Sequence, residues 1–165
     1  MKTKIFSLMA TMLFITGPAQ AESATVSTKS LSMTLAHQLA LASANTCSKQ
    51  GYQVAVAVVD RSGNLLSFIR NPLSGHHTIA VSQGKAYTAA TFQSRTISMM
   101  QNNQNLRGAP GVLLIGGGVP IRIGGHFYGA VGVSGAPAKK ISGDVDEACA
   151  NAGIDAIREA VEFAD

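Results

Sequence analysis

Residues 116–137 read GGGVPIRIGGHFYGAVGVSGAP, a stretch in which glycines interrupt residues that are typical of β-strands. Glycine weakens a strand through its backbone entropy, so turns, close packing or a nearby ligand must offset that cost. We expect turns at Gly116–Gly118 and Gly124–Gly125, with strands over 119–123 and 127–134. Two strands joined by so short a turn run antiparallel, which favours an α+β domain over a parallel, doubly wound sheet.

Strict alternation along the last of these strands divides its side chains between two faces of the sheet. One face would carry Phe127, Gly129, Val131 and Val133, and the other Tyr128, Ala130, Gly132 and Ser134. Apart from its aromatic residue, the second face carries only small side chains, so a helix, another subunit or a flat ligand can approach it closely. Because strand glycines most often serve packing, we expect a helix there.

The segments on either side of this stretch fit the same architecture. Apolar runs predict further strands, and helical spacing or alanine-rich composition predicts helices. The expected strands are 52–60, 65–70 and 111–117, and the expected helices are 31–50, 79–92, 95–103 and 142–163. Thr78 is suited to cap the second of these helices. Together the elements predict one α+β domain, a five-stranded antiparallel sheet flanked by helices.

The first 21 residues are expected to form a secretory signal peptide. Met1–Lys4 is a basic head, Ile5–Ile15 is apolar, and Ala19–Ala21 fits the small-residue cleavage rule. A membrane anchor is the alternative, but this apolar run is shorter than the ~20 residues that span a bilayer. We therefore expect residues 22–165 to form the mature domain, periplasmic in a Gram-negative organism or secreted.

Charge and composition restrict the partners that the mature chain can take. The formal net charge is +4, and it falls to +2 when cleavage removes Lys2 and Lys4 and no acid. So weak a charge does not indicate nucleic-acid binding, and no further long apolar segment indicates a membrane. Charged residues make up only 13% of the chain, which favours self-association, so we expect a homo-oligomer.

The two cysteines, Cys47 and Cys149, leave two alternatives open. An oxidising compartment permits a disulfide between them, and the other reading is a pair of buried thiols. Because the chain has no CxxC motif, a thioredoxin-like redox site or a zinc ribbon is not expected.

Common catalytic motifs are absent from the sequence. The chain lacks GxSxG, HExxH and GxxxxGK[ST], which argues against the usual hydrolase and NTPase chemistries. Acids are few before Asp144, so a hydrolase with two carboxylates is poorly supported. The residues themselves therefore favour a non-enzymatic protein.

Histidines and a few basic residues are the candidate ligand groups. Histidine is the usual nitrogen donor to a metal or to haem iron, and we keep His37, His76 and His77 as candidate metal ligands. His126 is expected to be exposed in its turn. Anionic groups of a ligand would be met by Lys85, Arg107 or Arg122, although the default interpretation of each is a solvated surface charge.

Four segments resemble the GlcG/HbpS-like family, and together they cover about residues 31–163. They are VAVAVVDRSGNLLSFIR (54–70), GKAYTAATF (84–92), the opening stretch 116–137 and DVDEACANAGIDAI (144–157). The resemblance implies a profilin-like fold, assembly into oligomers and, for several members, haem binding. Two departures stand out: Asn71–Ser74 replaces the usual Met-Asp-Gly-Ala, and Lys139–Ser142 extends the loop before the last helix.

The resemblance also implies a role for His37, because some members use a first-helix histidine for iron. We therefore expect an exported haem-binding protein for haem sensing, storage or handling, with His37 as axial ligand. Lys85, Arg107 or Arg122 would meet the haem propionates. One alternative is a non-enzymatic oligomeric accessory domain that binds another small molecule or a partner protein. Another is an enzyme with haem-dependent peroxide chemistry.

Overall fold

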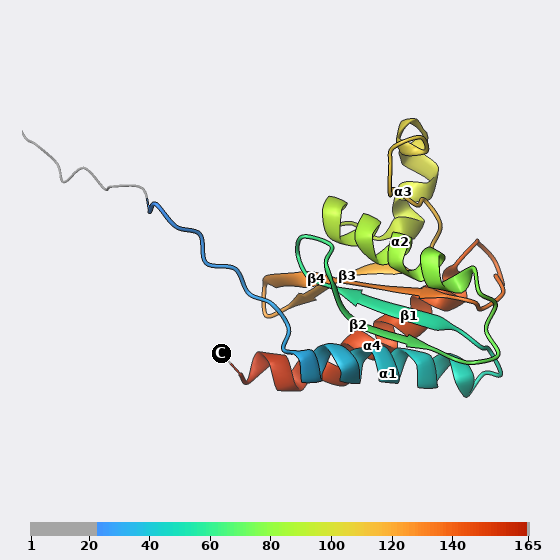
Figure 1. Cartoon of the computed structure of the whole chain (residues 1–165), viewed down its shortest axis with the longest axis horizontal. Coiled ribbons are helices and arrows are strands. Elements are labelled where there is room, and N and C mark those ends of the chain that lie inside the picture. Colours follow the sequence, from blue (N-terminus) through green and yellow to red (C-terminus); the bar gives the residue numbers. More distant parts are fainter. Residues whose placement is uncertain (1–22, 165) are drawn as a thin grey trace, which may run out of the picture.

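The computed structural model describes residues 23–164, in which helices cover both faces of one antiparallel sheet (Figure 1). The helices are α1 (Met33–Ser48), α2 (Thr78–Phe92), α3 (Thr96–Asn102), the 3-10 helix η1 (Gln104–Leu106) and α4 (Asp144–Glu162). The strands are β1 (Ala55–Val59), β2 (Leu65–Arg70), β3 (Gly118–Ile123) and β4 (His126–Ser134). The expected α+β class and the four α-helices are confirmed.

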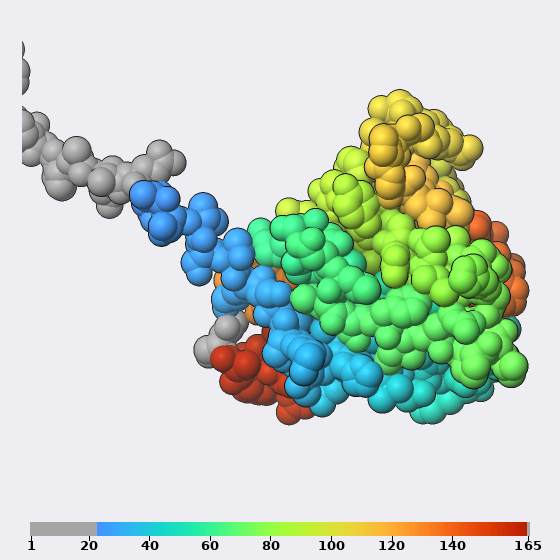
Figure 2. All heavy atoms as spheres, viewed as in Figure 1, coloured from blue at the N-terminus to red at the C-terminus, as the bar shows by residue number. Residues whose placement is uncertain are grey.

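The sheet has the strand order β2-β1-β4-β3, and every neighbouring pair is antiparallel. Helices α1 and α4 pack side by side on one face, while α2 covers the other (Figure 1). The segment that carries α3 and η1 protrudes from the body on the α2 side (Figure 2). The main core lies between the sheet and α1 with α4, and a smaller core lies beneath α2.

The sheet has four strands within residues 23–164, so the expected fifth strand over 111–117 is wrong. That segment runs along α2 instead of joining the sheet. The Leu113 N–H donates to the Thr88 hydroxyl of α2 at 2.8 Å, and Leu113 packs against Gly84. The Thr88 hydroxyl accepts from this backbone, and Gly84 leaves room for its apolar residue, so a run of strand-like composition stays irregular.

The expected faces of β4 are only partly right, because a β-bulge interrupts its pairing with β3. The register shifts between Ile121 and Arg122, so that Gly129 pairs with Ile121 and Phe127 with Arg122. An extra residue on one strand reverses the alternation beyond it. Phe127 therefore joins the core beneath α2, while Tyr128 joins the core on the opposite face.

Helix α2 packs closely on Gly132 of β4, which confirms the expected role of the small face. A Cβ at Gly132 would lie 2.6 Å from the Ala86 backbone nitrogen and would also meet the Ser82 carbonyl. Real Cβ atoms do not approach backbone atoms so closely, so only glycine allows this contact. Thr78 is not the cap that we expected: α2 begins at Thr78, and its hydroxyl donates to the Gly75 carbonyl.

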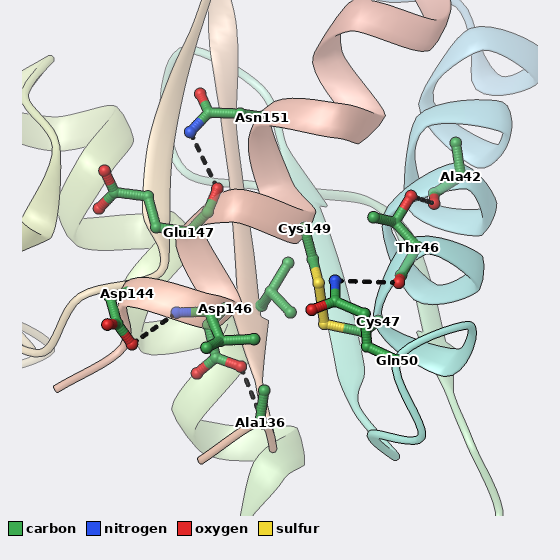
Figure 3. The surroundings of a disulfide bond; sticks show 12 residues. Ala42, Thr46, Cys47, Gln50, Ala136, Asp144, Asp146, Glu147, Cys149 and Asn151 are labelled. Atoms are coloured by element: carbon green, nitrogen blue, oxygen red, sulfur yellow. Dashed lines mark hydrogen bonds between the residues drawn. A yellow bond between two sulfur atoms is a disulfide. The ribbon is translucent and has the colours of Figure 1, made fainter. Parts of the chain in front are cut away.

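Cys47 and Cys149 form a disulfide, which decides between the two alternatives that the sequence left open (Figure 3). Their Cα atoms are 5.6 Å apart, and both side chains are fully buried. The bond joins the end of α1 to the first turns of α4. It therefore fixes α1 in the layer that α1 and α4 share.

The structure bears on the expectation about membrane spans but not on the expected signal peptide. Within residues 23–164, no helix is both long enough and apolar enough to cross a bilayer. The expected signal peptide, residues 1–21, lies outside the described residues.

Candidate functional site

His37 lies on the exposed side of α1, beside a surface depression of about 540 Å³. This α1–β2 depression is lined by Met33, Thr34, His37, Gln38, Leu66 and Ser67. Its size falls in the range of roughly 300–1,000 Å³ that is usual for small-molecule sites. Within residues 23–164, the His37 imidazole has no hydrogen-bond partner, so a ring nitrogen is available to a ligand.

The apolar spacing of α1 explains why His37 faces outward. Leu35 and Leu39 pack in the core, and His37 lies between them in the sequence but on the other side of the helix. Met33 and Leu41 stand one turn before and one turn after His37, and they are 79% and 44% exposed. His37 is thus the polar centre of an exposed apolar stripe.

Sequence reasoning singled out His37 as a candidate but did not single out the residues around it. Met33 and Leu41 share the four-residue spacing of His37, which was a readable signal for one exposed helix face. Leu66 comes from β2 and reaches the depression because this edge strand is only partly covered. Sequence alone does not show that β2 lies beside this part of α1.

Lys85 is not available to a ligand, which corrects its expected place at a propionate. It is 1% exposed, and its ammonium donates to Asp146 Oδ2 at 2.7 Å and to the Val133 carbonyl at 2.9 Å. Burial lowers the pKa of Lys85, although the Asp146 carboxylate opposes that effect. Burial likewise raises the pKa of Asp146 against the charge of Lys85.

Arg107 and Arg122 are exposed, but the structure does not bring them to His37. Arg107 follows η1 in the segment that protrudes on the α2 side. Arg122 donates to Gln93 at the end of α2 and stacks on Phe127. Since α1 covers the opposite face of the sheet, neither guanidinium belongs to the α1–β2 depression.

The other histidines stand apart from His37 as well. His76 and His77 are exposed in the loop before α2, and His126 is exposed at the start of β4. In the part of the chain that the structure describes, no three His, Cys, Asp or Glu side chains gather as a metal site. His37 is the one histidine that lines the α1–β2 depression, so a ligand there would meet a single imidazole from the described residues.

The fold and this depression define a class: a small α+β domain whose first helix presents an exposed imidazole at the surface. The family model "Haem degrading protein HbpS-like" matches residues 31–155, which is most of the chain. The protein belongs to this HbpS-like family, and the resemblance inferred from the sequence is confirmed.

Individual relatives agree with that assignment. Protein GlcG of Escherichia coli K12 is 34% identical over 108 residues, which are 63% of this chain and 81% of GlcG. A double mutant of HbpS from Streptomyces reticuli has a TM-score of 0.74 at 32% identity, covering 84% of this chain and 95% of that one. A PduOC:heme complex has a TM-score of 0.69 at 26% identity, covering 78% and 95%.

Proposed function

We propose that this protein is an exported haem-binding protein in which His37 is the axial ligand of the iron. The family to which the chain belongs, and the haem complex of a relative with the same fold, support a haem-related function. The observation that carries the proposal is the exposed His37 imidazole, without a hydrogen-bond partner in the described chain, at the α1–β2 depression. A neutral imidazole nitrogen is the common protein ligand of haem iron.

The residues of the depression fit a flat, mostly apolar group. Met33 and Leu66 offer apolar contact on either side of His37, one from α1 and one from β2. Burying such surface stabilises a complex by about 25 cal/mol per Å² of apolar area. Haem would supply a redox-active iron there, while this chain would supply the nitrogen ligand and the apolar walls.

Propionate carboxylates need polar partners that differ from those expected from the sequence. Besides His37, the polar side chains of the depression are Thr34, Gln38 and Ser67, all neutral. We propose that hydroxyl and amide donors from this set, together with water, meet the propionates in place of Lys85, Arg107 and Arg122. Neutral donors give weaker hydrogen bonds than guanidinium groups do, so binding would rest on the iron bond and apolar burial.

Export is part of the proposal and draws on the disulfide. Disulfides persist in oxidising compartments and are rare in the cytosol, so Cys47–Cys149 supports a periplasmic or secreted location. Cell fractionation with an antibody would test this. Recovery of the protein only in the cytosolic fraction, with both thiols free, would contradict it.

The ligand assignment is tested by titrating hemin into the mature protein and into single histidine variants. We expect a shifted Soret band in the parent protein and its loss in His37→Ala. His126→Ala is the matched control, because His126 is also an exposed histidine but lies at the start of β4, away from the α1–β2 depression. A parent protein that leaves the hemin spectrum unchanged would favour the accessory-domain alternative.

A further inference from the structure

Two arginines share one nearly buried phenylalanine ring on the α2 face of the sheet. The guanidinium carbon of Arg61 lies 5.0 Å from the centroid of Phe127, and that of Arg122 lies 5.1 Å from it. Arg61 follows β1 and Arg122 belongs to β3, the two strands that flank β4 on either side. The fold therefore brings two positive charges from separate segments to one ring.

Each guanidinium is also held by a hydrogen bond. Arg61 Nη1 donates to the Phe127 carbonyl at 2.6 Å, and Arg122 Nη2 donates to Gln93 Oε1 at 2.8 Å. Gln93 ends α2 in a left-handed conformation, with φ of 49°, which is unusual for a residue other than glycine. Both side chains are thus oriented in advance, which lowers the entropy cost of binding a ligand.

Neither arginine has a carboxylate partner among residues 23–164. The adjacent acid, Asp60, is occupied by its own turn: it accepts from the Ser62 N–H, the Asn64 N–H and the Asn64 side-chain amide. Only one nitrogen of each guanidinium is engaged by the described residues, so the remaining N–H groups face solvent. Two uncompensated cations with free donors are a suitable environment for a negative group.

We propose that Arg61 and Arg122 form a binding site for a small oxyanion, a carboxylate or a phosphate. The guanidinium fork matches the geometry of both groups. This Arg61–Arg122 site lies on the face of the sheet opposite to α1. It is therefore separate from the His37 site and does not rest on the proposed function.

Solution NMR of the mature protein would test the site. Inorganic phosphate and acetate are titrated in separate arms at constant ionic strength, with chloride as the reference anion. We expect saturable shifts of the backbone amides around Arg61 and Phe127 in at least one arm, and the arm that saturates distinguishes phosphate from carboxylate. If neither phosphate nor acetate causes larger shifts than chloride does, the proposal is overturned. The two arginines would then only pack against the Phe127 ring.

Variants separate binding from a purely structural role. Arg61→Gln and Arg122→Gln should each weaken the saturating anion about tenfold or more, since each removes charge-assisted hydrogen bonds. Arg122→Lys keeps the charge but loses the fork, so it should weaken binding while the amide spectrum stays folded. Arg158→Gln, on α4 at the other face, is the matched control and should bind like the parent. Undiminished binding in both glutamine variants would also overturn the proposal.

Discussion

Lys85 of α2 and Asp146 of α4 form a buried ion pair that joins the two helical layers around the sheet. Their charged atoms are 2.7 Å apart, and the two residues are 1% and 3% exposed. Asp146 also accepts the Ala136 N–H at 2.9 Å (Figure 3). One carboxylate therefore holds α2 and the segment that follows β4. Gly117 packs directly against this pair, which explains one glycine of the 116–137 stretch.

Asp146→Asn should destabilise the fold by about 3–5 kcal/mol, because it leaves the Lys85 ammonium buried without a countercharge. Urea denaturation followed by circular dichroism measures the change. Lys85→Met combined with Asp146→Asn should recover most of the loss, since Asn still accepts from Ala136 and no charge stays buried. A single variant as stable as the parent would show that the pair contributes nothing.

Removing the disulfide should cost about 2–5 kcal/mol, given that it closes a long loop. Cys47 and Cys149 are 102 residues apart, and their bond ties the helix that carries His37 to α4. The comparison is between the parent and Cys47→Ala/Cys149→Ala in thermal melts. Adding dithiothreitol to the double variant serves as control and should change nothing. Equal melting temperatures for parent and variant would contradict this role of the bond.

Gly132→Ala should destabilise the protein by roughly 1–3 kcal/mol, the usual cost of overpacking. The added methyl group would meet the backbone of α2 at Ser82 and Ala86, which cannot rotate away as a side chain can. Gly108→Ala is the control, because nothing lies within 4 Å of its Cβ position and its φ is not in the left-handed region. The two variants should differ clearly in their urea midpoints, and matching midpoints would refute the close-packing argument.

The lowered pKa of Asp144 predicts that the folded protein loses stability in acid. Hydrogen bonds from backbone N–H groups, Lys139 first and then Lys140, Ile141 and Val145, hold the pKa of Asp144 below its ordinary 3.8. The unfolded chain therefore binds the proton more readily, so this stabilisation is present above pH 3.8 and is lost as pH falls through the lower folded pKa.

The Asp144 prediction is measured by comparing Asp144→Asn with the parent in urea melts between pH 6 and pH 3. The parent should be more stable at pH 6, and the difference should shrink toward pH 3. Asp155→Asn, at an exposed position of α4, controls for the loss of a negative charge. A difference that grows as the pH falls would have the wrong sign.

Most of the fold was predictable because each helix carries its own local pattern. The last helix was expected over 142–163 and spans Asp144–Glu162, with Ile154, Ile157 and Val161 buried as the apolar spacing requires. The absence of the expected fifth strand was not predictable from a local pattern. Residues 111–117 have strand-like composition, and only the tertiary contact with Thr88 of α2 decides their conformation.

In the candidate sites, too, local patterns were predictable and contacts between distant residues were not. The outward position of His37 follows from the apolar spacing of one helix, so the sequence was sufficient. The burial of Lys85 depends on Asp146, which is 61 residues away, and nothing local distinguishes this lysine from a surface one. Arg61 escaped notice for a similar reason, since the bulged register of β4 determines which side chains reach Phe127.

The central claim, that His37 supplies the axial nitrogen to haem, is tested most directly by chemical rescue. His37→Gly removes the imidazole and leaves room for a free one, and the ferric absorption spectrum is recorded with and without added imidazole. We predict that the variant alone lacks the parent Soret band and that imidazole restores it. A His37→Gly protein that shows the parent spectrum without imidazole would contradict the claim and move the iron ligand to another residue.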